Sequence, residues 1–303
     1  MFFKNLMIYR LPAPWAMTAE DLAEQLARKG FQPCGNQDQE TRGWVSPTGD
    51  EFLLHQVGDQ WLIALGFEQK LLPSSVVKQE AEVRAEAIAE QQGYKPGRKQ
   101  MKDLREQVLQ ELLPRAFVRR TKVFAWIDPV DGWLGVDAPS QTRAEDVLEV
   151  LRQTLDWLPL ALLRTELSPT SAMADWLAGG EAPAGFTIDQ DCELRSITED
   201  HAAVRYVHHP LEGEEVRGHL TAGKLPTRLA LTFDDRVSFV LTEKLELKRL
   251  DFLDLVKEKL EEQGAEDAAA LFDAGFALMT GELRRLLAAV VEALGGELRP
   301  NDG

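Results

Sequence analysis

The residues of this chain with the clearest chemical potential are cationic side chains gathered between positions 95 and 122. This segment holds nine Lys and Arg residues against three acids, a local charge of +6, whereas the whole chain has a net charge of −16 and the remainder therefore −22. Grouped guanidinium and ammonium groups bind phosphate oxygens. The nine cations are Lys95, Arg98, Lys99, Lys102, Arg105, Arg115, Arg119, Arg120 and Lys122.

The net charge alone argues against a nucleic-acid ligand, because a polyanion repels an acidic protein. The uneven distribution predicts instead a positive zone within a repelling shell, which accepts DNA in one place only. A solvated helix face is the alternative interpretation. Arg115 to Lys122 favour a binding surface, because they continue the charge past Pro114 into a different element. With Tyr94 and Phe117 as the only aromatic residues of the segment, duplex backbone fits better than unstacked bases.

A second, weaker basic group lies further along the chain. Three acids, Glu212, Glu214 and Glu215, dilute it, so ordinary surface charge is the favoured interpretation and a binding role stays a hypothesis. Its members are Arg205, His208, His209, Arg217, Lys224 and Arg228.

Sequence patterns for nucleotide or acyl chemistry are absent. The stretch from Gly93 to Lys99 lacks the glycine spacing and the following Ser or Thr of a G-x4-G-K-[ST] loop. No G-x-G-x-x-G or G-x-S-x-G string occurs. We therefore expect a protein that is not an enzyme.

Metal ligation also has little support in the sequence. His208 and His209 are neighbours whose side chains point apart if the chain is extended there. Asp234-Asp235 follows a predicted strand from Leu229 to Phe233 and is open to two interpretations, a metal-dependent nuclease edge or, as we prefer, a solvated hairpin tip. We expect no metal and no cofactor. The five histidines are His55, His201, His208, His209 and His219.

The expected location is the cytoplasm, without membrane association. The first residues do not resemble a secretory signal, and the apolar stretch from Leu286 to Leu294 is too short to span a membrane and contains Glu292. Cys34 and Cys192 form no CxxC pair and are interpreted as reduced thiols, with a single disulfide as the less favoured alternative.

The elements that position these residues indicate an α+β fold. Strand patterns precede residue 74, and long helical stretches rich in Ala, Glu, Lys and Arg follow, interrupted at Gly93 to Gly97. We expect a helical hairpin that projects as a finger over residues 74–115. Residues 1–73 and 116–166 form a central α+β region, and residues 167–303 form a C-terminal α+β base. Strands and helices alternate irregularly, which disfavours a parallel doubly wound sheet.

Local patterns add four detailed expectations. Thr18 caps a first helix, and Thr142 begins a capping signature for a later one. A strand is predicted for Lys244 to Leu247, and two separate helices for Ala265 to Gly275 and Gly281 to Leu294. In the finger, one helix face is apolar and predicted to be core, with Lys95, Arg98, Lys102 and Arg105 on the arc beside it. The apolar residues are Met101, Leu104, Val108 and Leu112.

Four strings together resemble the bacterial recombination-associated RdgC family. They are Phe3-Lys4-Asn5-Leu6-Met7-Ile8-Tyr9-Arg10-Leu11, Phe31-Gln32-Pro33-Cys34-Gly35, Leu112-Leu113-Pro114-Arg115-Ala116-Phe117 and Phe276-Ala277-Leu278-Met279-Thr280-Gly281-Glu282-Leu283. The resemblance implies a homodimer closed into a ring that encircles double-stranded DNA without sequence preference. It also implies antagonism of the RecA recombinase, a role in replication-fork repair, association with the nucleoid and no cofactor.

The resemblance assigns roles to particular residues. Phe117 corresponds to an apolar side chain that fills a pocket on the partner subunit, although the sequence by itself favours a buried strand residue. Arg205 to His209 corresponds to a region near the DNA path. Here His208 and His209 stand where a Lys would serve, and neutral imidazoles contribute little charge. An acidic scaffold that docks a basic partner without binding DNA is the competing function.

The charge distribution predicts how DNA binding depends on salt. About four to six phosphate contacts give a slope of log K against log salt of roughly −4 to −5. Titration with linear and closed duplexes of unrelated sequence checks this value, and an Arg115/Arg119/Arg120→Ala variant binds more weakly. Absence of binding at low salt favours the scaffold. Cleavage of DNA on addition of Mg²⁺ contradicts the expectation of no enzyme activity.

Overall fold

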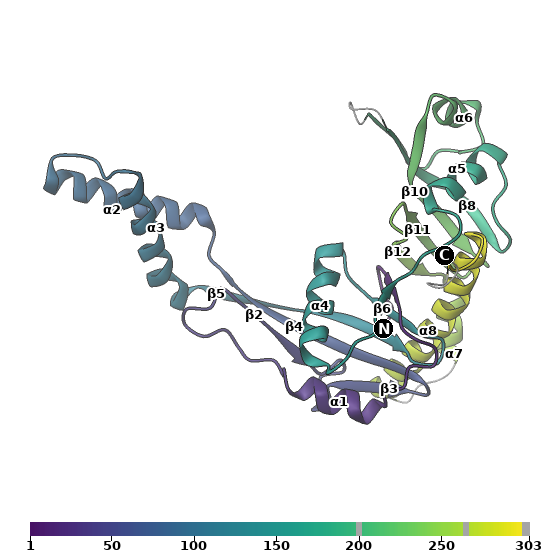
Figure 1. Cartoon of the computed structure of the whole chain (residues 1–303), viewed down its shortest axis with the longest axis horizontal. Coiled ribbons are helices and arrows are strands. Elements are labelled where there is room, and N and C mark those ends of the chain that lie inside the picture. The colour runs from purple at the N-terminus through teal and green to yellow at the C-terminus, as the bar shows by residue number, and fades with distance from the viewer. Residues whose placement is uncertain (198–201, 263–266, 299–303) are drawn as a thin grey trace.

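The computed structural model describes residues 1–197, 202–262 and 267–298, and these form a mixed α+β fold with two antiparallel sheets and eight α-helices (Figure 1). The first sheet has the strand order β2-β4-β5-β6-β1-β7, with β3 also paired to β4. Its strands are β1 (Met7–Arg10), β2 (Glu40–Val45), β3 (Leu54–Val57), β4 (Gln60–Leu71), β5 (Phe117–Asp128), β6 (Trp133–Val136) and β7 (Ala161–Leu162).

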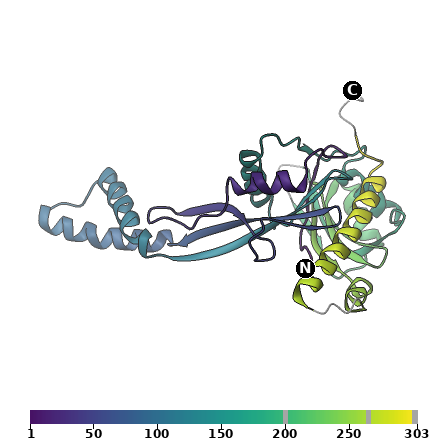
Figure 2. The same ribbon diagram turned by 90° about the horizontal axis from the view of Figure 1, so that it is seen from below.

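Strands β4 and β5 are much longer than the neighbouring strands β6, β1 and β7. Their ladder runs from Trp61 opposite Ile127 to Leu71 opposite Phe117, whereas β6 pairs with β5 only from Ala125 onward. The part formed by residues 66–71 and 117–122, here called the arm, therefore extends beyond β6, β1 and β7, and β2 follows it as far as Gln69 (Figures 1 and 2).

Two helices occupy the end of the arm, over the segment expected to be the finger. They are α2 (Ser74–Gln92) and α3 (Arg98–Leu112), followed by a 3-10 turn, Leu113–Arg115. Gly93 ends α2 at φ 79°, a left-handed conformation that glycine adopts without strain. The predicted apolar face is confirmed, since Leu104 and Val108 are buried against α2. Figure 1 shows the two helices far from the second sheet.

Helices α1 (Ala19–Ala27) and α4 (Gln141–Thr154) cover one face of the first sheet (Figure 2). The expected cap of α1 is confirmed, because the Thr18 side chain accepts the Asp21 backbone N–H. The expected cap of α4 at Thr142 is wrong. Ser140, with an extended backbone, accepts the Arg143 N–H at 3.3 Å instead.

The second sheet has the strand order β12-β11-β10-β8-β9. The prediction of a strand over Lys244 to Leu247 is wrong, because the chain turns there, with Leu245 at φ 61° and its N–H bonded to the Thr242 carbonyl. The strands are β8 (Phe186–Ser196), β9 (Ala203–Tyr206), β10 (Lys224–Phe233), β11 (Val237–Thr242) and β12 (Leu247–Phe252). The accompanying helices are α5 (Pro169–Gly179), α6 (Glu214–Thr221), α7 (Asp254–Glu262) and α8 (Ala268–Ala293).

Helix α8 is one continuous helix where the sequence predicted two. Gly275 and Gly281 lie inside it, although each glycine costs roughly 1 kcal/mol of helix propensity. Phe276, Met279 and Leu283 are fully buried along one side. Burial of that apolar side outweighs the propensity that suggested a break.

One hydrophobic core joins the two sheets. Leu6 and Leu247 exchange backbone hydrogen bonds of 2.7 and 3.0 Å, which links the start of the chain to β12. Phe3 and Trp126 from the first part of the chain share this core with α8 and the second sheet. The second sheet is therefore held directly to the base of the arm.

Both cysteines are free thiols, as expected. Burial, followed by the nearby Glu193 carboxylate, raises the pKa of Cys192 to about 12. Within the described ranges, no helix is both long and apolar enough to cross a membrane.

The packing of α8 predicts a large stability difference between two leucines on the same helix. Leu283→Ala leaves a cavity in the shared core and lowers the free energy of unfolding by about 2–5 kcal/mol. Leu271→Ala, at a side chain that is 47% exposed, changes it by less than about 0.5 kcal/mol. Urea unfolding measures both values, and equal losses contradict the described burial.

Candidate nucleic-acid interface

The five finger cations all face solvent. Lys95 lies in the bend before α3, and the others follow the exposed side of that helix. Lys95 also lines a small hollow with Glu82 and Glu86 of α2, which offsets part of its charge. The finger cations are Lys95, Arg98, Lys99, Lys102 and Arg105.

The four cations after the finger, here called the arm cluster, do not share one face. Side chains alternate along β5, where Val123 enters the core under α1 and α4 and Phe124 packs against the other core. Arg119 therefore lies on the α1 and α4 side, whereas Arg120 and Lys122 lie on the opposite side. The cluster consists of Arg115, Arg119, Arg120 and Lys122.

Arg120 forms an ion pair with a buried acid, Glu68. Its Nε donates to Glu68 Oε2 at 2.5 Å, and the Glu68 side chain is only 2% exposed. This hydrogen bond, together with one from the Cys34 backbone N–H, holds the pKa of Glu68 below its usual value. Arg120 thus offers less free charge to a phosphate than Arg119, which forms no ion pair with any described residue.

Lys122 is oriented by two contacts near the base of the arm. Its Nζ donates to the Pro47 carbonyl at 2.8 Å and lies 5.0 Å from the centre of the Phe124 ring. The side chain remains exposed, so its charge faces solvent from a fixed position.

Phe117 is 85% exposed, which contradicts the alternative of a buried strand residue. Its pairing partner Leu71 and its neighbour Val118 are each 47% exposed. The arm therefore carries an apolar patch where it meets the finger.

The open face of the second sheet carries five further cations, here called the sheet cluster. The other face of this sheet packs Leu229 and Phe239 into the shared core with α8. The cluster draws on strands β8, β9, β10 and β12, and its members are Arg195, Arg205, Arg228, Lys248 and Arg249.

A buried acid organises the sheet cluster. Glu193 is 2% exposed, and its carboxylate lies 2.9 Å from Arg195 Nε and 2.6 Å from Arg205 Nη2. Thr227 donates a third hydrogen bond at 3.1 Å. Burial raises the pKa of Glu193, but the hydrogen bonds and the two guanidinium charges outweigh it and leave the pKa below its usual value.

The remaining cations continue the surface toward α4. Burial, and then the charge of Arg228, lowers the pKa of Lys248, whose Nζ donates to the Pro139 carbonyl just before α4. Arg249 is 74% exposed at its side chain and lies 3.4 Å from Asp191. Two adjoining hollows of about 280 and 290 Å³ share Glu193, Arg228 and Lys248, so the surface is continuous.

Only part of the second basic group predicted from sequence lies on this face. Arg205 and Arg228 do, whereas Arg217 is on α6 beside the end of α5, and Lys224 Nζ lies 3.3 Å from His219 Nδ1. Arg195, Lys248 and Arg249 were missed because acids surround them in the sequence. One signal in the sequence could have identified this face. Glu193 and Arg195 alternate with the apolar residues Cys192 and Leu194, which places both charged side chains on the same face of a strand.

His208 and His209 lie in the loop after β9 and are exposed. The chain is not extended there, because His208 has φ 51° and donates its N–H to the Asp191 carboxylate. His209 Nδ1 lies 2.7 Å from the Pro210 carbonyl oxygen. His201 lies outside the described residues.

The acidic pair considered as a nuclease edge forms the turn between β10 and β11. Asp234 and Asp235 have φ values of 49° and 53°, and Asp234 lies 2.5 Å from Arg285. Across residues 1–197, 202–262 and 267–298, no three His, Cys, Asp or Glu side chains are grouped so as to hold a metal ion.

Known proteins and one family model match this chain over nearly its whole length. A family model described as "Putative exonuclease, RdgC" matches residues 1–297. A protein of Dechloromonas aromatica strain RCB named Recombination-associated protein RdgC is 58% identical over 301 residues, covering 98% of this chain and 99% of that protein. Proteins of the same name from Janthinobacterium sp. strain Marseille and Bordetella parapertussis are each 50% identical, covering 98% and 99% of this chain and 99% and 100% of their own lengths. The chain therefore belongs to the RdgC family of recombination-associated proteins.

Proposed function

We propose that this protein binds double-stranded DNA through its phosphates, without reading sequence, as a ring-shaped homodimer that encircles the duplex. By occupying DNA in the nucleoid it restrains RecA-mediated recombination and acts in replication-fork repair. In this role it is not an enzyme and needs no cofactor. Membership of a recombination-associated family supports an action on DNA.

The sheet cluster is the observation that carries the proposal. Five cations from four strands share one open face of a protein whose net charge is −16. Each phosphate that such cations neutralise releases condensed counterions, which drives association with any duplex sequence. Acidic surface elsewhere discourages DNA from binding outside this face.

The geometry at Glu193 favours phosphate binding over simple surface charge. The carboxylate fixes Arg195 and Arg205 while their side chains stay 51% and 67% exposed. A guanidinium has five N–H donors, so donors remain for a phosphate after the contact with Glu193. Side chains already held in place lose less conformational entropy on binding.

The bent shape of the chain supports an encircling mode. The finger cations and the sheet cluster lie at opposite ends of the molecule, and α4 stands in the angle between the arm and the second sheet (Figure 1). A second copy that meets the first at both ends encloses a space with basic surfaces on both subunits. The exposed patch of Leu71, Phe117 and Val118 provides apolar area for one such contact.

The names of the relatives and of the family model point to different activities. "Recombination-associated protein" fits a binding role, whereas "Putative exonuclease" names a hydrolase. We favour binding because the acidic turn is tied to Arg285 and the cations are on other surfaces.

Removing two cations of the sheet cluster tests the DNA-binding proposal. Arg228→Ala/Arg249→Ala removes charge without unpairing Glu193, and we expect weaker binding with a salt slope shallower by about 2. Fluorescence anisotropy with duplexes of two unrelated sequences measures both quantities. Lys29→Ala/Lys257→Ala, at exposed positions just after α1 and on α7, is the control with the same change in charge. Equal losses in the two variants contradict binding through this face.

Phe117→Ala tests ring closure. The substitution weakens the dimer by roughly 30-fold or more, as expected of an interface anchor, and changes the free energy of unfolding by less than about 0.5 kcal/mol. Sedimentation velocity and urea unfolding measure the two effects. Phe52→Ala, at a side chain that is 64% exposed in the loop before β3, is the matched control. An unchanged dimer with unchanged retention on closed circular DNA rejects the assignment.

A further inference from the structure

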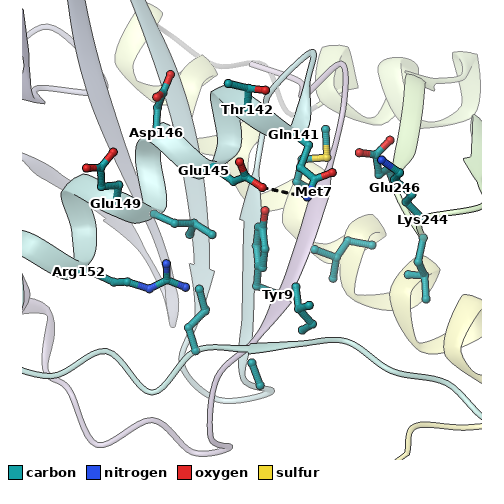
Figure 3. Close-up of a pocket in the computed structure, with 16 residues that line it drawn as sticks. Met7, Tyr9, Gln141, Thr142, Glu145, Asp146, Glu149, Arg152, Lys244 and Glu246 are labelled. Atoms are coloured by element: carbon teal, nitrogen blue, oxygen red, sulfur yellow. Dashed lines mark hydrogen bonds between the residues drawn. The ribbon is translucent and has the colours of Figure 1, made fainter.

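A cleft of about 840 Å³ lies where β1, α4, β7 and the turn between β11 and β12 meet (Figure 3). The proposed DNA surfaces do not use its interior. Four carboxylates line it against two cations, Arg152 and Lys244, so acids are in excess. The carboxylates are those of Glu145, Asp146, Glu149 and Glu246.

The carboxylates differ in how far they are already neutralised. Asp146 Oδ1 forms an ion pair with Arg42 Nη1 at 2.8 Å. Glu145 accepts only the Gln141 side-chain amide, at 2.9 Å, among its described contacts. Glu149 and Glu246 have their nearest cations, Arg42 and Lys248, only at 3.7 Å. Three carboxylates thus keep acceptor capacity.

Tyr9, a largely buried residue, directs its hydroxyl into the same cleft. Tyr9 is 8% exposed, and Figure 3 shows its hydroxyl end pointing toward Glu145. It forms no hydrogen bond with any residue that the structure describes, so the hydroxyl, which opens into the cleft, is available to a ligand there. Burial, and then the charges of Glu145 and Glu246, raise the pKa of Tyr9 to about 12, so the hydroxyl stays protonated at neutral pH.

The acceptors are arranged in a row. Figure 3 shows Glu149, Glu145 and Glu246 across the cleft, with Tyr9 next to the middle one. Glu145 and Glu149 are one helical turn apart on α4, about 6 Å along the axis. Apolar side chains, those of Met7, Leu148, Leu160 and Leu162, line the cleft with these acids.

We propose that this cleft binds a linear polyamine of the spermidine type. A protonated amine has donors and no acceptor, which matches the Tyr9 hydroxyl and the carboxylates. In such a polyamine each ammonium group pairs with one of the carboxylates, and the methylene chains between the ammonium groups pack against the leucine side chains. The Arg152 and Lys244 charges make the fit depend on where each ammonium group lies, and not on overall attraction alone.

The site also borders the proposed DNA surface. Gln141, Lys244 and Glu246 line both the cleft and one hollow of the sheet cluster. If the proposed function holds, a bound polyamine replaces acidic repulsion beside the DNA with positive charge. Binding of the polyamine itself does not require that function.

Calorimetry of the full-length protein with spermidine, without DNA and at physiological ionic strength, tests the proposal. We expect saturable 1:1 binding that Tyr9→Phe and Glu145→Gln each weaken by about tenfold. Tyr94→Phe, in the exposed bend of the finger, and Glu24→Gln, on α1, are the matched controls and keep full affinity. Thermal unfolding verifies that each variant is folded.

Comparison of ligands completes the test. n-Butylamine, with one ammonium group, binds at least about tenfold more weakly than spermidine if more than one acid takes part. Absent saturation, equal losses in Glu24→Gln and Glu145→Gln, or equal affinity for n-butylamine each overturns the proposal. Tighter binding of a short lysine peptide than of spermidine also overturns it, in favour of a protein lysine. Because no DNA is present, none of these results depends on the proposed function.

Discussion

The pairing of β4 with β5 is the constraint on which the other features depend. Trp61 to Leu65 lie between the two cores that pack on the first sheet, and the same two strands continue beyond β6 as the arm, with β2 beside them as far as Gln69. A shift of one residue in this register would move Trp126, which is buried and bonded to Gln60, to the opposite face. The register that buries Trp126 therefore also decides which side of the arm carries Arg119 and which carries Arg120.

Local signals in the sequence identified much of the fold, and tertiary effects account for what they missed. Composition and the glycines at 93 and 97 located the two finger helices, because a helical hairpin is defined by contacts near in sequence. The continuity of α8 depends on packing against a distant sheet, which propensity at Gly275 does not contain. The sheet cluster likewise depends on register, since β8 and β12 place Arg195 and Lys248 on one face although 53 positions separate them.

Buried carboxylates recur as partners of arginines. Glu68 holds Arg120, Glu193 holds Arg195 and Arg205, and Glu282 holds Arg236 and Arg285. An acid buried in this way is costly unless its partners stay in place, so each arrangement favours one orientation of its arginines. These three acids therefore add to the negative net charge while they hold cationic side chains in place from below.

The arm has a mechanical consequence. Five residue steps separate Gly66, where the arm begins, from Leu71, about 17 Å of extended strand. By simple geometry, a tilt of the strand direction by about 5° at Gly66 displaces the far end by ~1.5 Å. The ribbon thus acts as a lever that converts small angular changes in the sheet into translation of the two helices at its end.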